Sequence, residues 1–194
     1  MLKVILVGYG ELASSLMLGI LESGHEIAGV LRWENCKSNK YSLSFNNVIF
    51  PDNFSTLIKA YKIPEIRAKS VNSDEFANIA SKIKPDVVIV GSWSEILKKN
   101  AINIPKIACV NCHPSLLPKH WGSNPYSSVI RQGEEKTGIT FHLIDEGIDS
   151  GSILLQKEIN ISIDDSGLSL RKKCAFKAKE TVGEVLNGLE NSLL

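Results

Sequence analysis

The residues with the clearest chemical potential are an amide, an imidazole and a carboxylate, supplied by Asn111, His113 and Asp149. Asn111 and His113 follow the apolar run 107–110 and precede Pro114, which predicts a strand that ends at these polar side chains. Residues two apart in a strand share a face, so both side chains point the same way. Open α/β sheets bind ligands at the carboxyl ends of their strands. With Asp149 to orient or charge the imidazole, the three residues predict a catalytic site.

The segment 111–151 resembles the folate-dependent formyltransferases in four motifs. They are Asn-x-His-x-Ser-Leu-Leu-Pro at 111–118, Gly-x-x-Pro at 122–125, Thr-Gly-x-Thr at 137–140 and Asp-x-Gly at 149–151. The motifs keep the order of the family, and a looser likeness extends from residue 1 to about residue 160. The resemblance implies transfer of a formyl group from formyltetrahydrofolate to a primary amine, without a metal.

The resemblance also implies a role for each member of the catalytic trio. Asn111 and His113 are expected to stabilise the oxyanion that forms when the amine attacks the formyl carbon. Asp149 is expected to pair with His113 and help remove the amine proton. The alternative for Asp149 is loop structure alone, since Asp-Ser-Gly makes a good turn. The histidines without a recognisable partner in the sequence are His25, His120 and His142.

Two segments that follow or join predicted strands are expected to bind the folate, by resemblance to the family. Their backbone groups would bond the pterin ring, and apolar side chains would flank it. The expected folate residues are Trp93, Ser94, Glu95, Ile96 and Leu97 in the first segment, and Asp145, Glu146, Gly147 and Ile148 in the second. Trp93 is equally well interpreted as an ordinary half-buried aromatic residue.

The turn formed by Gly8, Tyr9, Gly10 and Glu11 has two interpretations. By resemblance it neighbours the acceptor substrate. Its Gly-x-Gly-x-x-Ala spacing after a strand also matches the dinucleotide fingerprint, so a nicotinamide-binding module is an alternative from another functional class. That fingerprint also has an acidic residue after the second strand, which binds the ribose. The match is incomplete here, because Leu31-Arg32-Trp33 precedes the first acidic residue.

The expected acceptor is a small primary amine, most simply an amino-sugar nucleotide. Methionyl-tRNA formyltransferases add a second domain and basic surfaces, whereas this chain has 194 residues and a net charge of +1. They also commonly carry an arginine where Trp121 stands. Glycinamide ribonucleotide transformylase has a Gly/Ser/Asn phosphate turn that residues 8–15 do not match. Formyltetrahydrofolate hydrolase would use the same trio with water as the acceptor, but carries a regulatory domain at its N-terminus.

The pattern along the chain predicts an α/β fold with a Rossmann-like, mostly parallel twisted sheet flanked by helices. A strand at 2–7, a helix at 11–23 and a strand at 25–31 form a β-α-β opening. Further strands are expected at 86–90, 107–113, 138–144 and 153–161. Helices are expected within 54–61, at 72–83 with Asn72 as N-cap, as a short helix through Leu97 and Lys98, at 125–133 and at about 166–194. Residues 34–46 are polar and predict a loop. One catalytic domain over residues 1–194 is expected.

Composition sets the remaining expectations. A hydrophobic content of 43% and a charged content of 22% are typical of a soluble globular protein. Neither a signal peptide nor a membrane span is recognisable, so a cytoplasmic protein without membrane or nucleic-acid partners is expected. The apolar stripe of the last helix favours packing on the sheet, with a homodimer as the alternative. Cys109 and Cys112 form a C-x-x-C pair, but residues three apart in a strand face opposite sides, which favours buried thiols over a metal or redox site.

Overall fold

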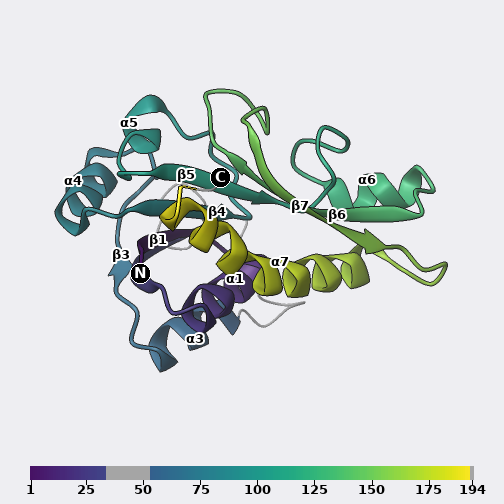
Figure 1. The fold of residues 1–194 in the computed structure, drawn as a ribbon, viewed down its shortest axis with the longest axis horizontal. Coiled ribbons are helices and arrows are strands. Elements are labelled where there is room, and N and C mark those ends of the chain that lie inside the picture. The colour runs from purple at the N-terminus through teal and green to yellow at the C-terminus, as the bar shows by residue number, and fades with distance from the viewer. Residues whose placement is uncertain (34–52, 193–194) are drawn as a thin grey trace.

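The computed structural model describes residues 1–33 and 53–192, which form one seven-stranded sheet with helices on both faces (Figure 1). The strand order is β3-β2-β1-β4-β5-β6-β7. The strands are β1 Lys3–Gly8, β2 Glu26–Arg32, β3 Glu65–Ile66, β4 Val87–Gly91, β5 Ala108–His113, β6 Lys136–Leu143 and β7 Ile153–Asn160. The helices are α1 Gly10–Glu22, α3 Asn53–Ala60, α4 Asp74–Ile83, α5 Lys99–Ile102, α6 Pro125–Arg131 and α7 Gly167–Glu190. The predicted α/β class is confirmed.

The sheet changes direction at the strand that carries Asn111 and His113. Strands β1 to β5 pair in parallel, whereas β6 pairs antiparallel with β5 and with β7. The register sets Asn111 opposite His142 and His113 opposite Thr140. β6 therefore ends beside Cys109 and Val110, and the β6–β7 loop runs back along β5 to bring Asp149 to Asn111 and His113.

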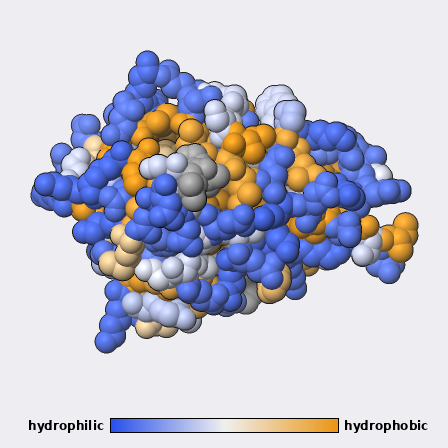
Figure 2. Space-filling model, viewed as in Figure 1, coloured by the Kyte–Doolittle hydropathy of each residue, from blue (hydrophilic) through white to orange (hydrophobic). Residues whose placement is uncertain are grey.

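Each face of the sheet has its own hydrophobic core, because successive strand residues point to opposite sides. On one face the inward residues of the central strands pack against α1, α3 and α7. On the other face they pack against α4, α5 and Leu97. Figure 1 shows α1 and α7 lying side by side across one face of the sheet. Figure 2 shows hydrophilic residues over most of that side of the molecule, with hydrophobic residues gathered near its middle.

The cysteines follow this alternation. Cys109 belongs to one core and Cys112 to the other, so the C-x-x-C pair diverges as expected. Burial raises the pKa of the Cys109 thiol to about 12 and the pKa of Cys112 well above its ordinary value. Among the described residues, Cys109, Cys112 and Cys174 are all free and buried. These thiols are packing residues.

Two local predictions need correction. The N-cap of α4 is Ser73, whose side chain accepts from the backbone N–H of Phe76, and not Asn72. Asn72 instead donates from its amide to the Ile96 carbonyl and accepts from the Lys98 backbone N–H, so it supports the β4–α5 loop. The short helix expected through Leu97 and Lys98 instead begins at Lys99. The polar loop predicted at 34–46 lies outside the described residues.

Candidate active site

The site is built at the carboxyl end of β5, where the apolar strand gives way to polar side chains. Asn111 is half-buried, and His113 is 5% exposed. Both project towards Asp149, which the β6–β7 loop brings back to the strand end. The sequence thus placed all three residues of the trio correctly relative to one another.

Asp149 is the centre of the hydrogen-bond network. Its Oδ1 accepts from the Asn111 amide at 3.2 Å, and its Oδ2 lies 3.3 Å from Nδ1 of His113. Oδ2 also accepts from the backbone N–H of Gly122 at 2.9 Å. The backbone of Asp149 has a φ of 51°, a left-handed conformation that aspartate tolerates better than most residues. Asp149 therefore does more than form a turn, because each of its two oxygens meets a different member of the site.

A fourth side chain, His142, completes the network and was not assigned from the sequence. Nδ1 of His142 donates to the Leu143 carbonyl at 2.8 Å, since a carbonyl oxygen can only accept. Nε2 is then free to accept from the Asn111 amide at 3.1 Å. The two N–H bonds of the Asn111 amide are thus directed at Asp149 and His142. Only the antiparallel register of β5 and β6 reveals this partner, because the two residues are 31 positions apart.

The segment between β5 and α6 covers the outer side of the trio. The carbonyl oxygen of His120 accepts from Nε2 of His113 at 3.0 Å, and Gly122 binds Asp149 as described above. Residues 115–118 are fixed by Thr140, whose hydroxyl donates to the Ser115 carbonyl and accepts from the Leu117 N–H. The Ser-Leu-Leu-Pro motif therefore acts as a scaffold that leads the chain back over the imidazole.

Burial and local charge act in opposite directions on the two ionisable groups of the pair. Burial lowers the pKa of His113, and the Asp149 carboxylate and the His120 carbonyl only partly oppose it, so the pKa stays below its ordinary value. Burial raises the pKa of Asp149, but the imidazoles of His142 and His113 and the Gly122 N–H outweigh it and leave that pKa below its ordinary value. Near neutral pH the pair is thus a carboxylate beside a neutral imidazole, which is the state that can accept a proton.

The two loops expected to hold the folate flank this network, and each presents one exposed isoleucine. Ile96 in the β4–α5 loop is 54% exposed, and Ile148 in the β6–β7 loop is 52% exposed. An ion pair between Lys99 and Glu146 links the two sides at 2.9 Å. Two large apolar side chains left in contact with solvent beside a polar catalytic group are typical of a ligand site.

Not every expected folate residue faces outward. Leu97 is 4% exposed and belongs to the core beneath the loop. The Glu95 carboxylate accepts from the Ser70 hydroxyl at 2.7 Å and from the Val71 N–H at 3.0 Å, so it fixes a neighbouring turn. Ser94 is exposed, with no side-chain hydrogen bond to another described residue.

Asp145 has a comparable structural role in the second loop. Its Oδ1 accepts from the Gly147 N–H and the Ser150 hydroxyl. Gly151 is required for close packing, because a Cβ there would lie 1.8 Å from the Leu143 carbonyl oxygen. These contacts set the path that delivers Asp149 to β5.

The β1–α1 turn lies at the carboxyl end of β1, two strands away from β5 in the sheet. A Cβ on Gly8 would lie 2.2 Å from the Gly91 carbonyl oxygen, so this glycine permits the close approach of β1 and β4. Tyr9 lies 6.2 Å from the Trp33 ring, and Trp33 meets Trp93 edge-on at 4.9 Å between ring centroids. Trp93 is therefore part of an aromatic cluster over the end of β1, and Glu11 is exposed at the start of α1.

Comparison with known proteins identifies the family. A sequence model described as Formyl transferase matches residues 4–186, nearly the whole chain. The chain belongs to the Formyl transferase family. The resemblance noted in the motifs at 111–151 is thereby confirmed, and the nicotinamide-binding alternative has no support from this match.

The formyltransferase relatives include proteins of two names. The methionyl-tRNA formyltransferase of Thermotoga maritima is 29% identical over 97% of this chain, and that of Kosmotoga olearia is 32% identical over 95%. The chain spans 59% and 58% of their respective lengths. The phosphoribosylglycinamide formyltransferase structure from Anaplasma phagocytophilum superposes with a TM-score of 0.80 at 18% identity, covering 98% of this chain and 88% of that one. The enzyme of that name from Streptococcus pneumoniae gives 0.78 at 16% identity over 98% and 99%. These superpositions show the same fold.

Two kinds of site are absent from the described part of this chain. It contains no cluster of three histidine, cysteine, aspartate or glutamate residues arranged to hold a metal ion. Among the helices placed in the structure, none is both long and apolar enough to cross a membrane.

Replacing Asp149 with asparagine should lower the pKa of His113 further. The carboxylate is the strongest of the groups that raise this pKa, and asparagine keeps the shape and tolerates the left-handed backbone. An NMR titration of the His113 ring measures the change. The matched control is Asp145→Asn in the same loop, which should leave the titration of His113 in place. An unaltered His113 pKa in the Asp149 variant would show that the two groups are not coupled.

Proposed function

We propose that this site transfers a formyl group from formyltetrahydrofolate to a primary amine. The observation that carries the proposal is the convergence of Asn111, His113 and His142 on Asp149 at the carboxyl end of β5, in a chain of the Formyl transferase family. A neutral imidazole beside a carboxylate can take up a proton, and an adjacent amide can donate a hydrogen bond. Formyl transfer to an amine needs both capacities.

The reaction breaks the bond from the formyl carbon to the donor nitrogen and forms a bond from that carbon to the acceptor nitrogen. The acceptor amine loses a proton, which Asp149 and His113 are placed to accept, directly or through water. The departing donor nitrogen takes up a proton in turn. Negative charge grows on the formyl oxygen, and the Asn111 amide and the protonated His113 ring are donors within reach of it. Because both Asn111 N–H bonds are engaged in the ligand-free site, the oxygen must share or replace one of those contacts.

The folate is assigned to the β4–α5 and β6–β7 loops beside the trio. Two features of the chain fit such a ring: the exposed side chains of Ile96 and Ile148, and loops whose folding is already fixed by Asn72 and Asp145. A flat heterocycle between apolar side chains gains from burial while the backbone satisfies its polar edge. When bound, the donor supplies the activated formyl group.

The comparisons favour a different acceptor from the amino-sugar nucleotide expected on sequence grounds. The sequence relatives described above carry the name methionyl-tRNA formyltransferase, at up to 32% identity across the catalytic region. We therefore take the amino group of a charged methionyl-tRNA as the first candidate. A nucleotide-linked amino sugar is the second, since Trp121 is 66% exposed beside the site and offers an aromatic surface where tRNA-type relatives carry an arginine.

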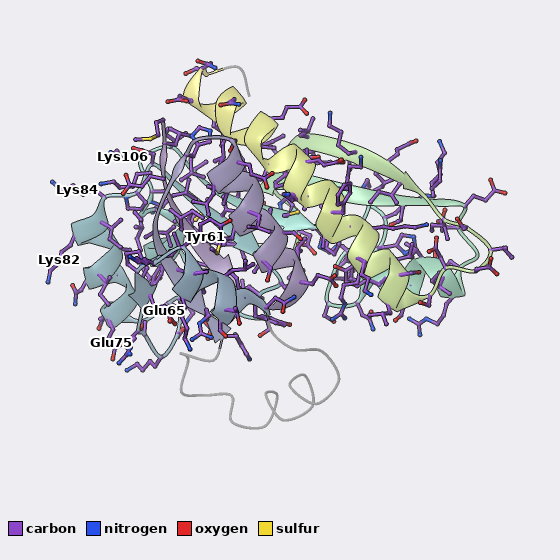
Figure 3. All side chains as sticks on the ribbon, turned by 90° about the horizontal axis from the view of Figure 1, so that it is seen from below. Tyr61, Glu65, Glu75, Lys82, Lys84 and Lys106 are labelled. Atoms are coloured by element: carbon purple, nitrogen blue, oxygen red, sulfur yellow. The ribbon has the colours of Figure 1, made fainter. Side chains whose placement is uncertain are left out.

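The charge distribution bears on the same choice. Lys84 and Lys106 precede β4 and β5, so they lie at the amino side of the sheet, opposite the trio. Figure 3 shows both, with Lys82, at one margin of the molecule, and Lys106 is paired with Asp86 at 2.7 Å. A methionyl-tRNA whose amino group lies at His113 would have to contact basic residues other than Lys84 and Lys106.

Three single alanine variants, at Asn111, His113 and Asp149, should each lower turnover by about a hundredfold or more. This is the usual effect of losing a proton-transfer group or an oxyanion donor. Formyl transfer is measured in purified variants whose fold is verified by circular dichroism. Cys112→Ala is the matched control, since Cys112 stands between Asn111 and His113 but faces the opposite core. Near-normal turnover by a folded His113→Ala variant would refute the mechanism.

An acceptor panel should rank charged methionyl-tRNA above glycinamide ribonucleotide, amino-sugar nucleotides and water. Activity on the best acceptor should rise from mildly acidic to mildly alkaline pH, because the attacking amine must be unprotonated and His113 neutral. The measurement is kcat/KM for each acceptor with the same folate donor. Efficient formylation of a sugar nucleotide, with none of the tRNA, would restore the amino-sugar assignment.

Ile96→Asp and Ile148→Asp should each weaken folate binding about tenfold or more, because each places a charge where an apolar ring surface is expected to lie. Calorimetry with a folate analogue gives the affinity directly. The same substitution at Ile163, which is 99% exposed on the β7–α7 connection, serves as the control. Unchanged affinity in both loop variants would place the folate elsewhere.

A further inference from the structure

His120 touches the catalytic imidazole with its backbone while its own ring points away from the trio. Its carbonyl oxygen accepts from Nε2 of His113 at 3.0 Å. Neither the carbonyl at Nε2 nor the Asp149 carboxylate at Nδ1 has a hydrogen to give, and a neutral His113 ring has one hydrogen for the two of them. The contact to the carbonyl is the shorter one and forms the hydrogen bond, which places that hydrogen on Nε2. The nitrogen left without a hydrogen is Nδ1, which lies 3.3 Å from Asp149.

That carbonyl is aimed by an unusual backbone. His120 has a φ of 56°, in the left-handed region that is strained for a non-glycine residue and persists only where the surroundings enforce it. The preceding carbonyl, of Lys119, accepts from the Ser115 hydroxyl at 2.8 Å. The following glycine, Gly122, is bound to Asp149. The chain on either side of His120 is therefore fixed, and His120 must turn sharply between these points.

The His120 ring is the anchor of this turn. Its Nδ1 lies 2.9 Å from the Ser128 hydroxyl on α6, and its Nε2 lies 3.4 Å from the carboxylate of Glu134 beyond that helix. The ring is 5% exposed, so it is held in the protein and not in solvent. These contacts attach the segment over the active site to α6 and to the strand that follows it.

We propose that His120 is a positioning residue: its ring anchors the turn, and its carbonyl fixes the hydrogen of His113 on Nε2, so that Nδ1 is the nitrogen that exchanges a proton with Asp149 and the reacting amine. The effect that this proposal predicts on kcat rests on the proposed formyl transfer. The placement of the hydrogen does not, because it is a property of the free protein.

Two acceptors compete for the single hydrogen of the neutral His113 ring, and the nearer of them faces Nε2. Asp149 from the β6–β7 loop approaches Nδ1, and the His120 carbonyl approaches Nε2. His142 from β6 bonds Asn111 and Leu143, and not the His113 ring. Around the His120 ring the charged groups are Glu134 and Lys119, which pair with each other at 3.2 Å.

The test combines nitrogen NMR of histidine-labelled protein with kinetics. In the wild type above the pKa of His113, the spectrum should show hydrogen on Nε2 and none on Nδ1. His120→Ala loses both contacts of the ring, so the spectrum should show a mixture of His113 rings with the hydrogen on Nε2 and on Nδ1. In this variant kcat should fall by about tenfold to a hundredfold, the scale of a misplaced catalytic group. KM for the folate should change by less than about threefold. His120→Asn should restore part of both readouts, because asparagine tolerates the left-handed backbone better than alanine does.

Further variants separate positioning from folding. Lys119→Gln removes the surface ion pair with Glu134 without touching the His120 ring and should behave as wild type. Ser128→Ala combined with Glu134→Ala removes both partners of the ring while His120 itself stays in place. This double variant should show the mixed spectrum and the lowered kcat whether or not His120→Ala folds.

Hydrogen on Nδ1 in the wild type, or an unchanged spectrum and kcat in folded His120→Ala and in the double variant, overturns the proposal. A shifted hydrogen with no formyl transfer by the wild type would uphold the role of His120 and remove only the proposed function.

Discussion

The carboxylate of Asp149 is the constraint on which the rest of the site depends. It lies in a half-buried position where an ionised group is costly unless it is paired and hydrogen-bonded. The protein meets that cost with an amide from β5, an imidazole from β5 and a backbone N–H from the β5–α6 segment. Each of these partners is held in turn by something else, so the position of one carboxylate determines the path of three segments.

The sheet topology makes this convergence possible. In a wholly parallel sheet, the residue across from Asn111 would come from a strand running the same way, and the next loop would leave from the same edge. Here β6 runs antiparallel, so His142 stands opposite Asn111 and β6 ends beside Val110. The loop after β6 then runs back along β5 and brings Asp149 to Asn111 and His113. Thr140 in the same strand fixes the Ser-Leu-Leu-Pro segment, and β7 contributes Gln156, which donates to Thr140 and to the Leu117 carbonyl. One reversal of direction thus positions the loop that carries Asp149 and the segment that covers His113.

The parts that were predictable from sequence are those with a local period or a breaking residue. Alternation in a strand placed Asn111 and His113 together and sent Cys109 and Cys112 to opposite cores. His142 and His120 were not predictable, because their partners lie across a strand pair or at the end of a segment whose backbone turns left-handed. Glu95 and Leu97 matched the expected folate segment in sequence, yet their side chains bind a turn and fill the core, since a loop exposes only some of its residues. For α4, two adjacent polar residues could cap the helix, and only tertiary contacts of Asn72 decide in favour of Ser73.

The buried polar network is better explained by chemistry than by stability. Replacing a buried charged cluster with apolar residues of similar volume is often neutral or stabilising, so folding alone would not require Asp149, His113 and His142 at this depth. The same burial that makes the cluster costly keeps the pKa of His113 below its ordinary value and so leaves the ring ready to accept a proton. The two hydrophobic cores sustain this arrangement, because they hold β5 rigidly from both faces while its last residues turn to polar contacts. A site of this kind needs a strand that is immobile up to Cys112 and a backbone that bends sharply soon after His113, and the change from apolar residues to Asn-x-His-Pro provides both within four positions.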